Sequence, residues 1–125
     1  IHDAARAFVP ADVVGRVSDA VRAGAPAVIP VTAVTDTIRE VDDLGSRVID
    51  RTRLRGVQTP QGFRRSIIED AHAALAETGT PVTDDAAAVE YTGNEVALVD
   101  GDALAFKITT PLDLLLARAV AEGRP

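Results

Sequence analysis

Hydrophobic residues recur at helical spacing in two stretches of the chain, residues 9–24 and residues 63–79. The apolar positions are Val13, Val14, Val17 and Val21 in the first stretch and Ile67, Ile68, Ala71 and Leu75 in the second. Each set falls on one face of a helix, and polar residues fill the opposite face. Pro10 lies near the start of the first stretch, and Gly24 and Gly79 follow the two apolar faces. The pattern predicts two amphipathic helices.

Two shorter stretches carry helix-start signals. Residues 83–93 begin with Thr83, a candidate N-cap, followed by two aspartates that suit the positive end of a helix dipole. The sequence TPLD places Thr110 as an N-cap, Pro111 at the first helical position and Asp113 three residues past the cap. Both stretches are therefore predicted to be helical.

Short runs of apolar and β-branched residues predict strands between these helices. Residues 26–31 read PAVIPV, which is typical of a short buried strand. Residues 95–109 are interpreted as two short strands broken at Gly101. Ile1, which runs directly into His2 and Asp3, is interpreted as the last step of a buried strand. Strand, helix and strand in this order predict a parallel α/β unit.

Residues 32–55 behave differently, because apolar and polar residues alternate on either side of the sequence DDLG. Alternation around a glycine-containing turn predicts an exposed two-stranded hairpin. An isolated hairpin is only marginally stable in water, so we expect this one to lean on another surface. A second copy of the chain is the candidate surface.

Composition and charge narrow the function classes. Apolar residues make up 46% of the 125 positions, cysteine is absent, and the formal net charge is −6. The lack of cysteine excludes disulfides and thiolate metal sites within this sequence. A surplus of acidic residues argues against broad nucleic-acid binding, which needs excess Lys and Arg. The printed sequence has no apolar run long enough to span a bilayer, so we expect no membrane partner.

The sequence contains no methionine, so we expect that a segment precedes Ile1 in the complete translation product. No basic and apolar signal region is visible at its start, which leads us to expect a cytoplasmic protein. Of the thirteen basic residues only Lys107 is a lysine. A compact ammonium is not interchangeable with a guanidinium at a binding site, although codon bias also explains such an imbalance.

Ligands of open α/β sheets bind beyond the carboxyl ends of the strands, so residues that follow strands are candidates. Four residues qualify, namely Asp3, Thr59, Thr83 and Lys107. Asp3 is a candidate ligand for Mg²⁺, or a cap for a nearby turn. Thr83 is a candidate anion contact, or a cap for its own helix. Both alternatives remain open from the sequence.

Arg51, Arg53 and Arg55 would project to one side of an extended backbone. Such a row is a candidate phosphate clamp, but a charged edge strand has the same pattern. His2 and His72 have no partner at metal-ligand spacing, and no Ser carries the local signature of an activated nucleophile.

Five short motifs occur in a specific order, namely HDAAR, TDTI, an Arg eight residues before TPQGF, TDDA and KIT. In this order they resemble the second half of 2-C-methyl-D-erythritol 4-phosphate cytidylyltransferases. QTPQGF, AFKITTPLDLLLA and the Arg- and Ala-rich composition are similar to actinobacterial members. Ala7 and Arg39 depart from the residues common in the family, Pro and Lys, at positions beside the matched ones.

The resemblance implies part of a Rossmann-like nucleotidyltransferase sheet, with helices on both faces and a protruding β-hairpin arm. It implies that residues 1–31 and 51–125 form the second half of the core, that residues 32–50 form an arm for homodimerisation, and that the CTP-binding half lies upstream. The chain by itself is then expected to be inactive.

The resemblance also implies the roles of the site residues. Asp3 is expected to bind Mg²⁺ or another divalent cation. Thr37, Arg51, Thr59, Thr83 and Lys107 are expected to contact the sugar-alcohol phosphate. Arg51 and Lys107 are expected to position its phosphate for attack on CTP, and Thr37 and Arg51 to serve the site of the partner subunit.

Two other functions remain open at this point. A ribitol 5-phosphate cytidylyltransferase shares the architecture and several of the motifs. A non-catalytic dimerisation or binding module is the alternative from another class, because the printed sequence lacks the nucleotide loop.

Overall fold

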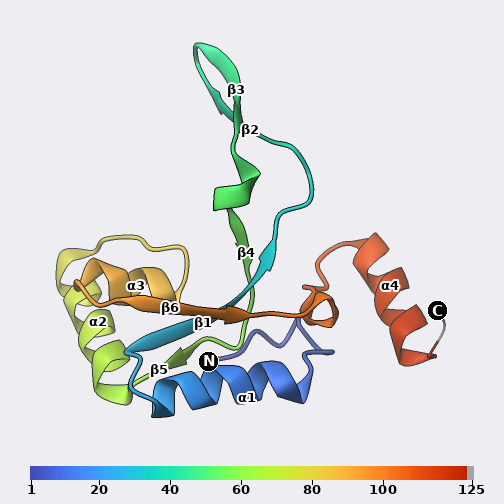
Figure 1. Cartoon of the computed structure of the whole chain (residues 1–125). Coiled ribbons are helices and arrows are strands. Elements are labelled where there is room, and N and C mark those ends of the chain that lie inside the picture. The colour runs from blue at the N-terminus through green and yellow to red at the C-terminus, as the bar shows by residue number, and fades with distance from the viewer. Residues whose placement is uncertain (124–125) are drawn as a thin grey trace.

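A computed structural model shows a mixed α/β fold and describes residues 1–123 (Figure 1). The helices are α1 (Ala11–Arg22), α2 (Arg65–Thr78), α3 (Asp85–Tyr91) and α4 (Pro111–Ala121). The strands are β1 (Ala27–Ala33), β2 (Ile38–Asp42), β3 (Gly45–Ile49), β4 (Arg55–Val57), β5 (Gly62–Phe63) and β6 (Val96–Asp100). Two 3₁₀ turns, η1 (Arg51–Arg53) and η2 (Ala103–Ala105), complete the order. The predicted helices and the hairpin are confirmed.

Strand β1 is the centre of the main sheet. It pairs in parallel with β6 along one edge, from Ala27 opposite Val96 to Val31 opposite Asp100. Strands β4 and β5 both pair antiparallel with the other edge of β1. The parallel partners β1 and β6 therefore end at the same side of the sheet, where α/β folds present their ligands.

The strand predicted at Ile1 is wrong, because residues 1–3 adopt no regular secondary structure and Ile1 is exposed. Ile1 and Gln61 nevertheless exchange both backbone hydrogen bonds, each 2.8 Å long. This single pair of ladder-type bonds holds the first residue beside the segment between β4 and β5. The parallel pair of the sheet is β1 with β6.

Helices cover both faces of the main sheet. A Cβ atom on Gly62 would come within 2.5 Å of the Val17 side chain, so α1 packs directly on the face that Gly62 and its partner Val28 share. The neighbouring pair Ala27 and Phe63 faces the opposite side. There Ala27 packs in a buried cluster with residues of α2 and α3, namely Ala71, Leu75, Ala88 and Val89.

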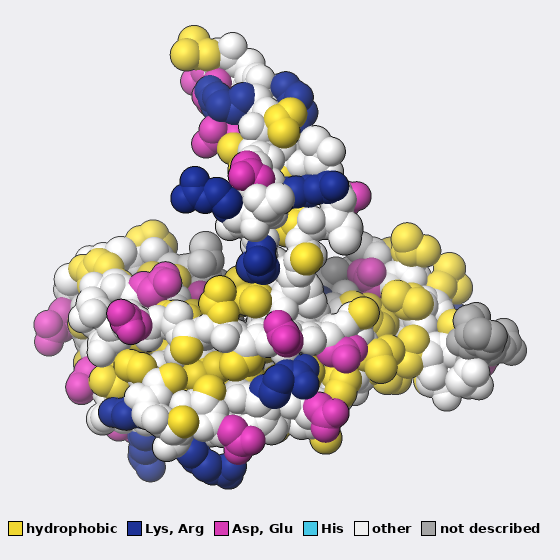
Figure 2. All heavy atoms as spheres, viewed as in Figure 1, with side chains coloured by type: hydrophobic (Ala, Val, Ile, Leu, Met, Phe, Trp, Pro, Cys, Tyr) yellow, Lys and Arg dark blue, Asp and Glu magenta, His cyan; other side chains and the backbone are white. Residues whose placement is uncertain are grey.

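The hairpin β2–β3 and the turn η1 project from the body as an arm, defined here as residues 34–53 (Figure 1). Its surface carries mixed charge (Figure 2), and Arg47 pairs with Glu40 at 2.9 Å and with Asp42 at 2.5 Å. Leu44 at its tip and Val41 on β2 are 96% and 75% exposed. The arm therefore presents apolar side chains that the described residues do not cover.

Two local predictions at the C-terminal side of the sheet are wrong. Asp84 rather than Thr83 caps α3, because its carboxylate accepts from the backbone N–H of Ala87 at 2.8 Å. The second strand predicted after Gly101 is replaced by η2, which Asp102 caps by accepting from the Leu104 N–H at 2.8 Å. Lys107 therefore follows an irregular segment instead of a strand.

The last helix begins with the predicted capping box. The Thr110 hydroxyl accepts from the Asp113 N–H at 3.2 Å, and the Asp113 carboxylate accepts from the Thr110 N–H at 2.8 Å. Hydrophobic side chains gather over α4 in Figure 2, where its leucines at positions 112, 114, 115 and 116 are exposed. Among residues 1–123 no helix has the length and apolar character needed to cross a membrane.

We expect the start of α4 to loosen at acidic pH. The Thr110 hydroxyl and the backbone N–H groups of Thr109 and Thr110 donate to Asp113 and hold its pKa below the ordinary value of 3.8. A lowered pKa means that the carboxylate stabilises the fold above pH 3.8, and that this contribution disappears as the pH falls through the lowered value.

The difference in melting temperature between wild type and Asp113→Ala should therefore shrink between about pH 7 and pH 2. Asp36→Ala is the matched control, because Asp36 is exposed and its carboxylate makes no hydrogen bond or ion pair within residues 1–123. A difference for Asp113→Ala that does not change with pH would contradict the assignment.

Candidate functional site

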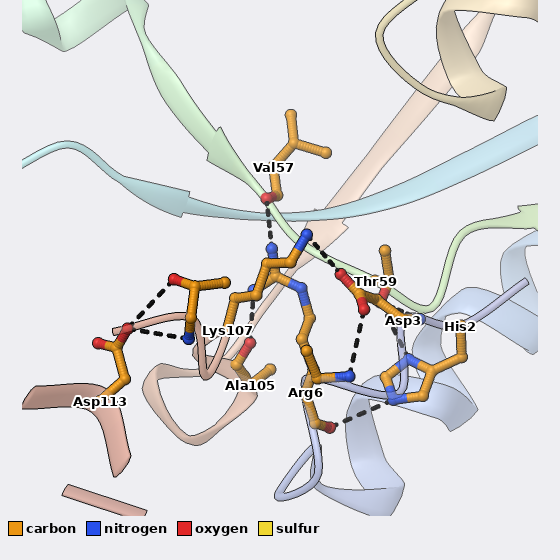
Figure 3. Close-up of polar contacts among 10 residues, drawn as sticks. His2, Asp3, Arg6, Val57, Thr59, Ala105, Lys107 and Asp113 are labelled. Carbon is orange, nitrogen blue, oxygen red and sulfur yellow. Dashed lines mark hydrogen bonds and ion pairs between the residues drawn. The ribbon is translucent and has the colours of Figure 1, made fainter. Parts of the chain in front are cut away.

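The Asp3 carboxylate connects the N-terminal segment to Lys107, on the side of the sheet where β1 and β6 end (Figure 3). Its Oδ2 lies 2.9 Å from Lys107 Nζ, and its Oδ1 accepts from the Ala5 N–H at 3.2 Å. The backbone N–H of Asp3 donates to Thr59 Oγ1 at 3.0 Å. The Lys107 ammonium, followed by the Ala5 N–H, holds the pKa of Asp3 below its usual value. Asp3 is therefore ionised at neutral pH.

Asp3, Thr59 and Lys107, three of the four candidates named from the sequence, thus lie together in one cluster. The side chains of Lys107 and Asp3 are 49% and 30% exposed. A ligand in solvent can consequently reach both charges. The cluster presents a cation, a carboxylate and a hydroxyl within one small area.

His2 orients the hydroxyl group of this cluster. Its Nε2 lies 3.2 Å from the Arg6 carbonyl, which can only accept, so Nε2 carries a proton. When the ring holds one proton, Nδ1 is an acceptor and the Thr59 hydroxyl donates to it over 3.0 Å. Thr59 then donates to His2 and accepts from the Asp3 N–H, which fixes the position of its oxygen.

Arg6 holds the first loop against the segment that carries Lys107. Its guanidinium donates to the Ala105 carbonyl at 2.6 Å and to the Val57 carbonyl at 3.4 Å. The Ala5 carbonyl accepts from the Ile108 N–H at 2.9 Å. Lys107 lies between these two anchor points, so its backbone is held on both sides.

Thr83 lies outside the Asp3 cluster, on the exposed approach to α3. The buried side chain of Gln61 ties this helix to the Thr59 segment, because it donates to Asp84 at 3.0 Å and accepts from the Ala86 N–H at 3.2 Å. The Thr83 hydroxyl makes no hydrogen bond within residues 1–123. It is therefore free to meet a ligand.

Thr37 and Arg51 lie on the arm. The Arg51 guanidinium donates to the Thr35 carbonyl, and Thr37 is exposed. No hydrogen bond or ion pair within the described residues joins either of them to the Asp3 cluster. The chain therefore separates its predicted site residues into the Asp3 cluster on the core, Thr83 before α3, and a pair on the arm.

The extended backbone that a row of Arg51, Arg53 and Arg55 would require is not formed, because residues 51–53 adopt the 3₁₀ turn η1. Asp50 accepts from the Thr52 N–H at 3.1 Å and from the Thr52 hydroxyl at 2.6 Å. These bonds stabilise the 3₁₀ turn η1, and a turn does not place alternate side chains on one side.

The described residues contain no group of three or more His, Cys, Asp or Glu side chains that could hold a metal ion by themselves. Mg²⁺ does not require such a group, because it is commonly bound by one or two carboxylates together with water and substrate phosphates. Asp3 fits this kind of site, since its carboxylate is ionised and partly exposed.

Four residues that support the site carry no signal of that role in the sequence, namely His2, Arg6, Gln58 and Gln61. Gln58 and Gln61 flank Thr59 in QTPQGF and are 7% and 4% exposed. Burial of a glutamine depends on neighbours that are distant in sequence, so one sequence does not distinguish it from a solvated glutamine.

Comparison with known proteins gives a consistent result. Residues 1–122 match the family model described as 2-C-methyl-D-erythritol 4-phosphate cytidylyltransferase. The chain is 52% identical over 122 residues to the protein of this name from Saccharopolyspora erythraea, covering 96% of this chain and 53% of that protein. It is 50% identical over 124 residues to the one from Rhodococcus jostii, covering 98% and 54%.

Solved structures show the same similarity. The crystal structure of 2-C-methyl-D-erythritol 4-phosphate cytidylyltransferase from Thermus thermophilus superposes with a TM-score of 0.89 at 44% identity, over 97% of this chain and 60% of that chain. This chain spans about half the length of the curated relatives it matches.

Proposed function

This chain belongs to the 2-C-methyl-D-erythritol 4-phosphate cytidylyltransferase family, and on that premise we propose that it forms the acceptor-substrate side of an enzyme that joins CTP to 2-C-methyl-D-erythritol 4-phosphate. The products are the CDP-linked sugar alcohol and pyrophosphate. The observation that carries the proposal is the ion pair between Lys107 and Asp3, 2.9 Å apart beside the Thr59 hydroxyl.

The reaction is a phosphoryl-type transfer. A phosphate oxygen of the sugar phosphate attacks the α-phosphorus of CTP, a new P–O bond forms, and the bond to the β-phosphate breaks as pyrophosphate leaves. No covalent bond to the protein is needed. Catalysis then depends on holding the two phosphates in line and on neutralising their charge.

In this proposal Lys107 positions the attacking phosphate. Its ammonium is partly exposed and anchored by Asp3, so it offers a charge-assisted hydrogen bond from a fixed place. Thr59 is held by His2 and by the Asp3 N–H, and it limits where the substrate can lie. Thr83 contributes a hydroxyl from the start of α3.

Asp3 would hold a divalent cation such as Mg²⁺ together with the phosphates of CTP. When bound, the cation neutralises negative charge on these phosphates. Asp3 would also keep Lys107 in place through their ion pair, so the same carboxylate would contact both the divalent cation and the Lys107 ammonium.

The arm is proposed to complete the site of a second subunit. Thr37 and Arg51 lie on the arm and make no hydrogen bond or ion pair with the Asp3 cluster of their own chain. If two chains exchange arms across a two-fold axis, Thr37 and Arg51 reach the sugar phosphate bound by the partner.

Product analysis tests the proposed function. We expect the intact protein to convert CTP and 2-C-methyl-D-erythritol 4-phosphate into the CDP-linked product, as measured by mass spectrometry and pyrophosphate release. Ribitol 5-phosphate in the same assay should give at least about tenfold less product, because a site shaped for one substrate discriminates against the other by at least about 1.4 kcal/mol.

Faster turnover of ribitol 5-phosphate would show that this compound, and not 2-C-methyl-D-erythritol 4-phosphate, is the substrate. Turnover of neither sugar phosphate would favour a non-catalytic dimerisation or binding module. The 125-residue chain by itself is expected to give no product, because it spans about half the length of its relatives.

A further inference from the structure

Gln58 makes an unusual contact with the segment that follows β6. Its side chain is 7% exposed and lies immediately before Thr59. Its Nε2 donates to the Asp102 carbonyl at 2.9 Å, and its Oε1 accepts from the Asp102 N–H at 3.1 Å. The side-chain amide thus forms the two hydrogen bonds that a neighbouring strand would form, here with the backbone of a residue 44 positions away.

Gly101 allows this contact by leaving room for the glutamine. A Cβ atom at position 101 would lie 2.3 Å from Gln58 Oε1 and 3.1 Å from the Val31 carbonyl. Gln58 and Gly101 also donate their backbone N–H groups to Pro30 and Val31, at 2.9 and 2.8 Å. The Gln58 side chain therefore bridges the exits of β4 and β6, which lie on the two edges of β1 beside Pro30 and Val31.

The contact continues directly into the segment that carries Lys107. The Asp102 carbonyl that accepts from Gln58 also accepts from the Ala105 N–H at 3.0 Å, which closes the turn η2. The Ala105 carbonyl binds Arg6, and Phe106 stacks on Phe8 with ring centroids 6.1 Å apart. Lys107 is the next residue.

We propose that Gln58 is a positioning residue which, with Gly101, sets the start of segment 102–108 and so holds Lys107 at the phosphate site. This inference rests on the proposed function, in which Lys107 contacts the sugar phosphate. Gln58 is adjacent to Thr59, so the same residue contributes to the spacing between the hydroxyl and the ammonium of the site.

The side chain at position 58 must both donate and accept. Glutamate has the same shape, but its carboxylate cannot donate to the Asp102 carbonyl. Gln58→Glu therefore loses one bond and places a buried negative charge beside a carbonyl oxygen. Gln58→Ala loses both bonds without adding a charge.

Steady-state kinetics of the intact protein test the inference. We expect Gln58→Ala to lower kcat/KM for the sugar phosphate by about tenfold to a hundredfold, because small displacements of a positioned group have effects of this size. The KM for CTP should not change. Val89→Ala, which removes buried methyl groups from the α2–α3 side of the core, is the control for general loss of stability.

A double-mutant cycle separates positioning from a merely structural role. If Gln58 acts through Lys107, Gln58→Ala should have little further effect on kcat/KM in the Lys107→Ala background. Gly101→Ala should lower kcat/KM of the otherwise wild-type protein by a similar factor. It should lower kcat/KM less in the Gln58→Ala background, because the Gln58 Oε1 atom with which the new Cβ would clash is absent. Independent, multiplicative losses from Gln58→Ala and Lys107→Ala would overturn the proposal.

Amide hydrogen exchange gives a readout that needs no activity. Gln58→Ala should accelerate exchange at Ala105, Phe106 and Ile108 by about tenfold or more and leave the arm unchanged. Unchanged protection at Ile108, on the far side of Lys107, would overturn the inference even in an active enzyme. An inactive wild type with accelerated exchange in Gln58→Ala would instead reject the proposed function and retain the positioning of the segment.

Discussion

Replacing Lys107 by arginine in the intact protein is expected to lower kcat/KM by about tenfold or more, which corresponds to roughly 1.4 kcal/mol of transition-state stabilisation. Arginine keeps the positive charge, but its guanidinium is a wide planar fork that does not fit the place of a compact ammonium. In the structure the ammonium lies 2.9 Å from Asp3 Oδ2, with Arg6 bound to the nearby Ala105 carbonyl. Lys107→Ala should lose about a hundredfold or more, because the charge itself is removed.

The fold should tolerate both changes. Lys107 is half exposed, and the loss of a solvent-exposed ion pair usually costs no more than about 1 kcal/mol of the free energy of unfolding. Arg22→Lys is a matched control, since Arg22 makes an exposed ion pair with Asp19 on α1. Steady-state kinetics and a thermal melt on the three variants separate the roles, and unchanged kinetics for Lys107→Arg would remove Lys107 from the site.

Deleting the β2–β3 hairpin of the arm is expected to leave the intact protein, proposed above to be a dimer, as a monomer and to abolish turnover. The deletion replaces residues 38–49 with a short glycine–serine linker and leaves Thr37 and Arg51 in the chain. A two-stranded hairpin is marginally stable in isolation, and this one exposes Val41, Leu44 and Val48. Packing against a partner would cover these side chains and hold the arm in place.

Light scattering measures the molar mass, and the kinetic assay measures turnover on the same samples. Arg47→Ala is the control, because it removes the charge pairs within the arm and leaves the apolar side chains. A deletion variant that remained dimeric would show that the arm is not the interface. A monomer with full activity would show that Thr37 and Arg51 do not serve a partner.

Elements whose signals are local could be predicted from the amino-acid sequence alone. The capping box at Thr110, Pro111 and Asp113 and the valine face of α1 involve residues within a few positions of one another. The arm likewise follows from alternation around one turn. The order of short motifs was enough to indicate the family, since it does not depend on contacts.

Where the local sequence allowed two structures, contacts with distant residues determined which one forms. Thr83 and Asp84 are both good N-caps, and the structure selects Asp84, whose other carboxylate oxygen accepts from the buried side chain of Gln61. The residues after Gly101 have strand-like composition, but Gln58 and Asp102 direct them into a 3₁₀ turn.

Which candidate residues lie together depends on contacts between segments that are distant in the sequence. Thr59 reaches Asp3 across 56 positions, and Lys107 reaches Asp3 from near the opposite end of the chain. Such contacts depend on the pairing of β1 with β4 and β6, which brings distant segments to one edge of the sheet. A hydrogen bond or ion pair acts over about 3–4 Å in space, whereas a sequence pattern records only neighbours along the chain.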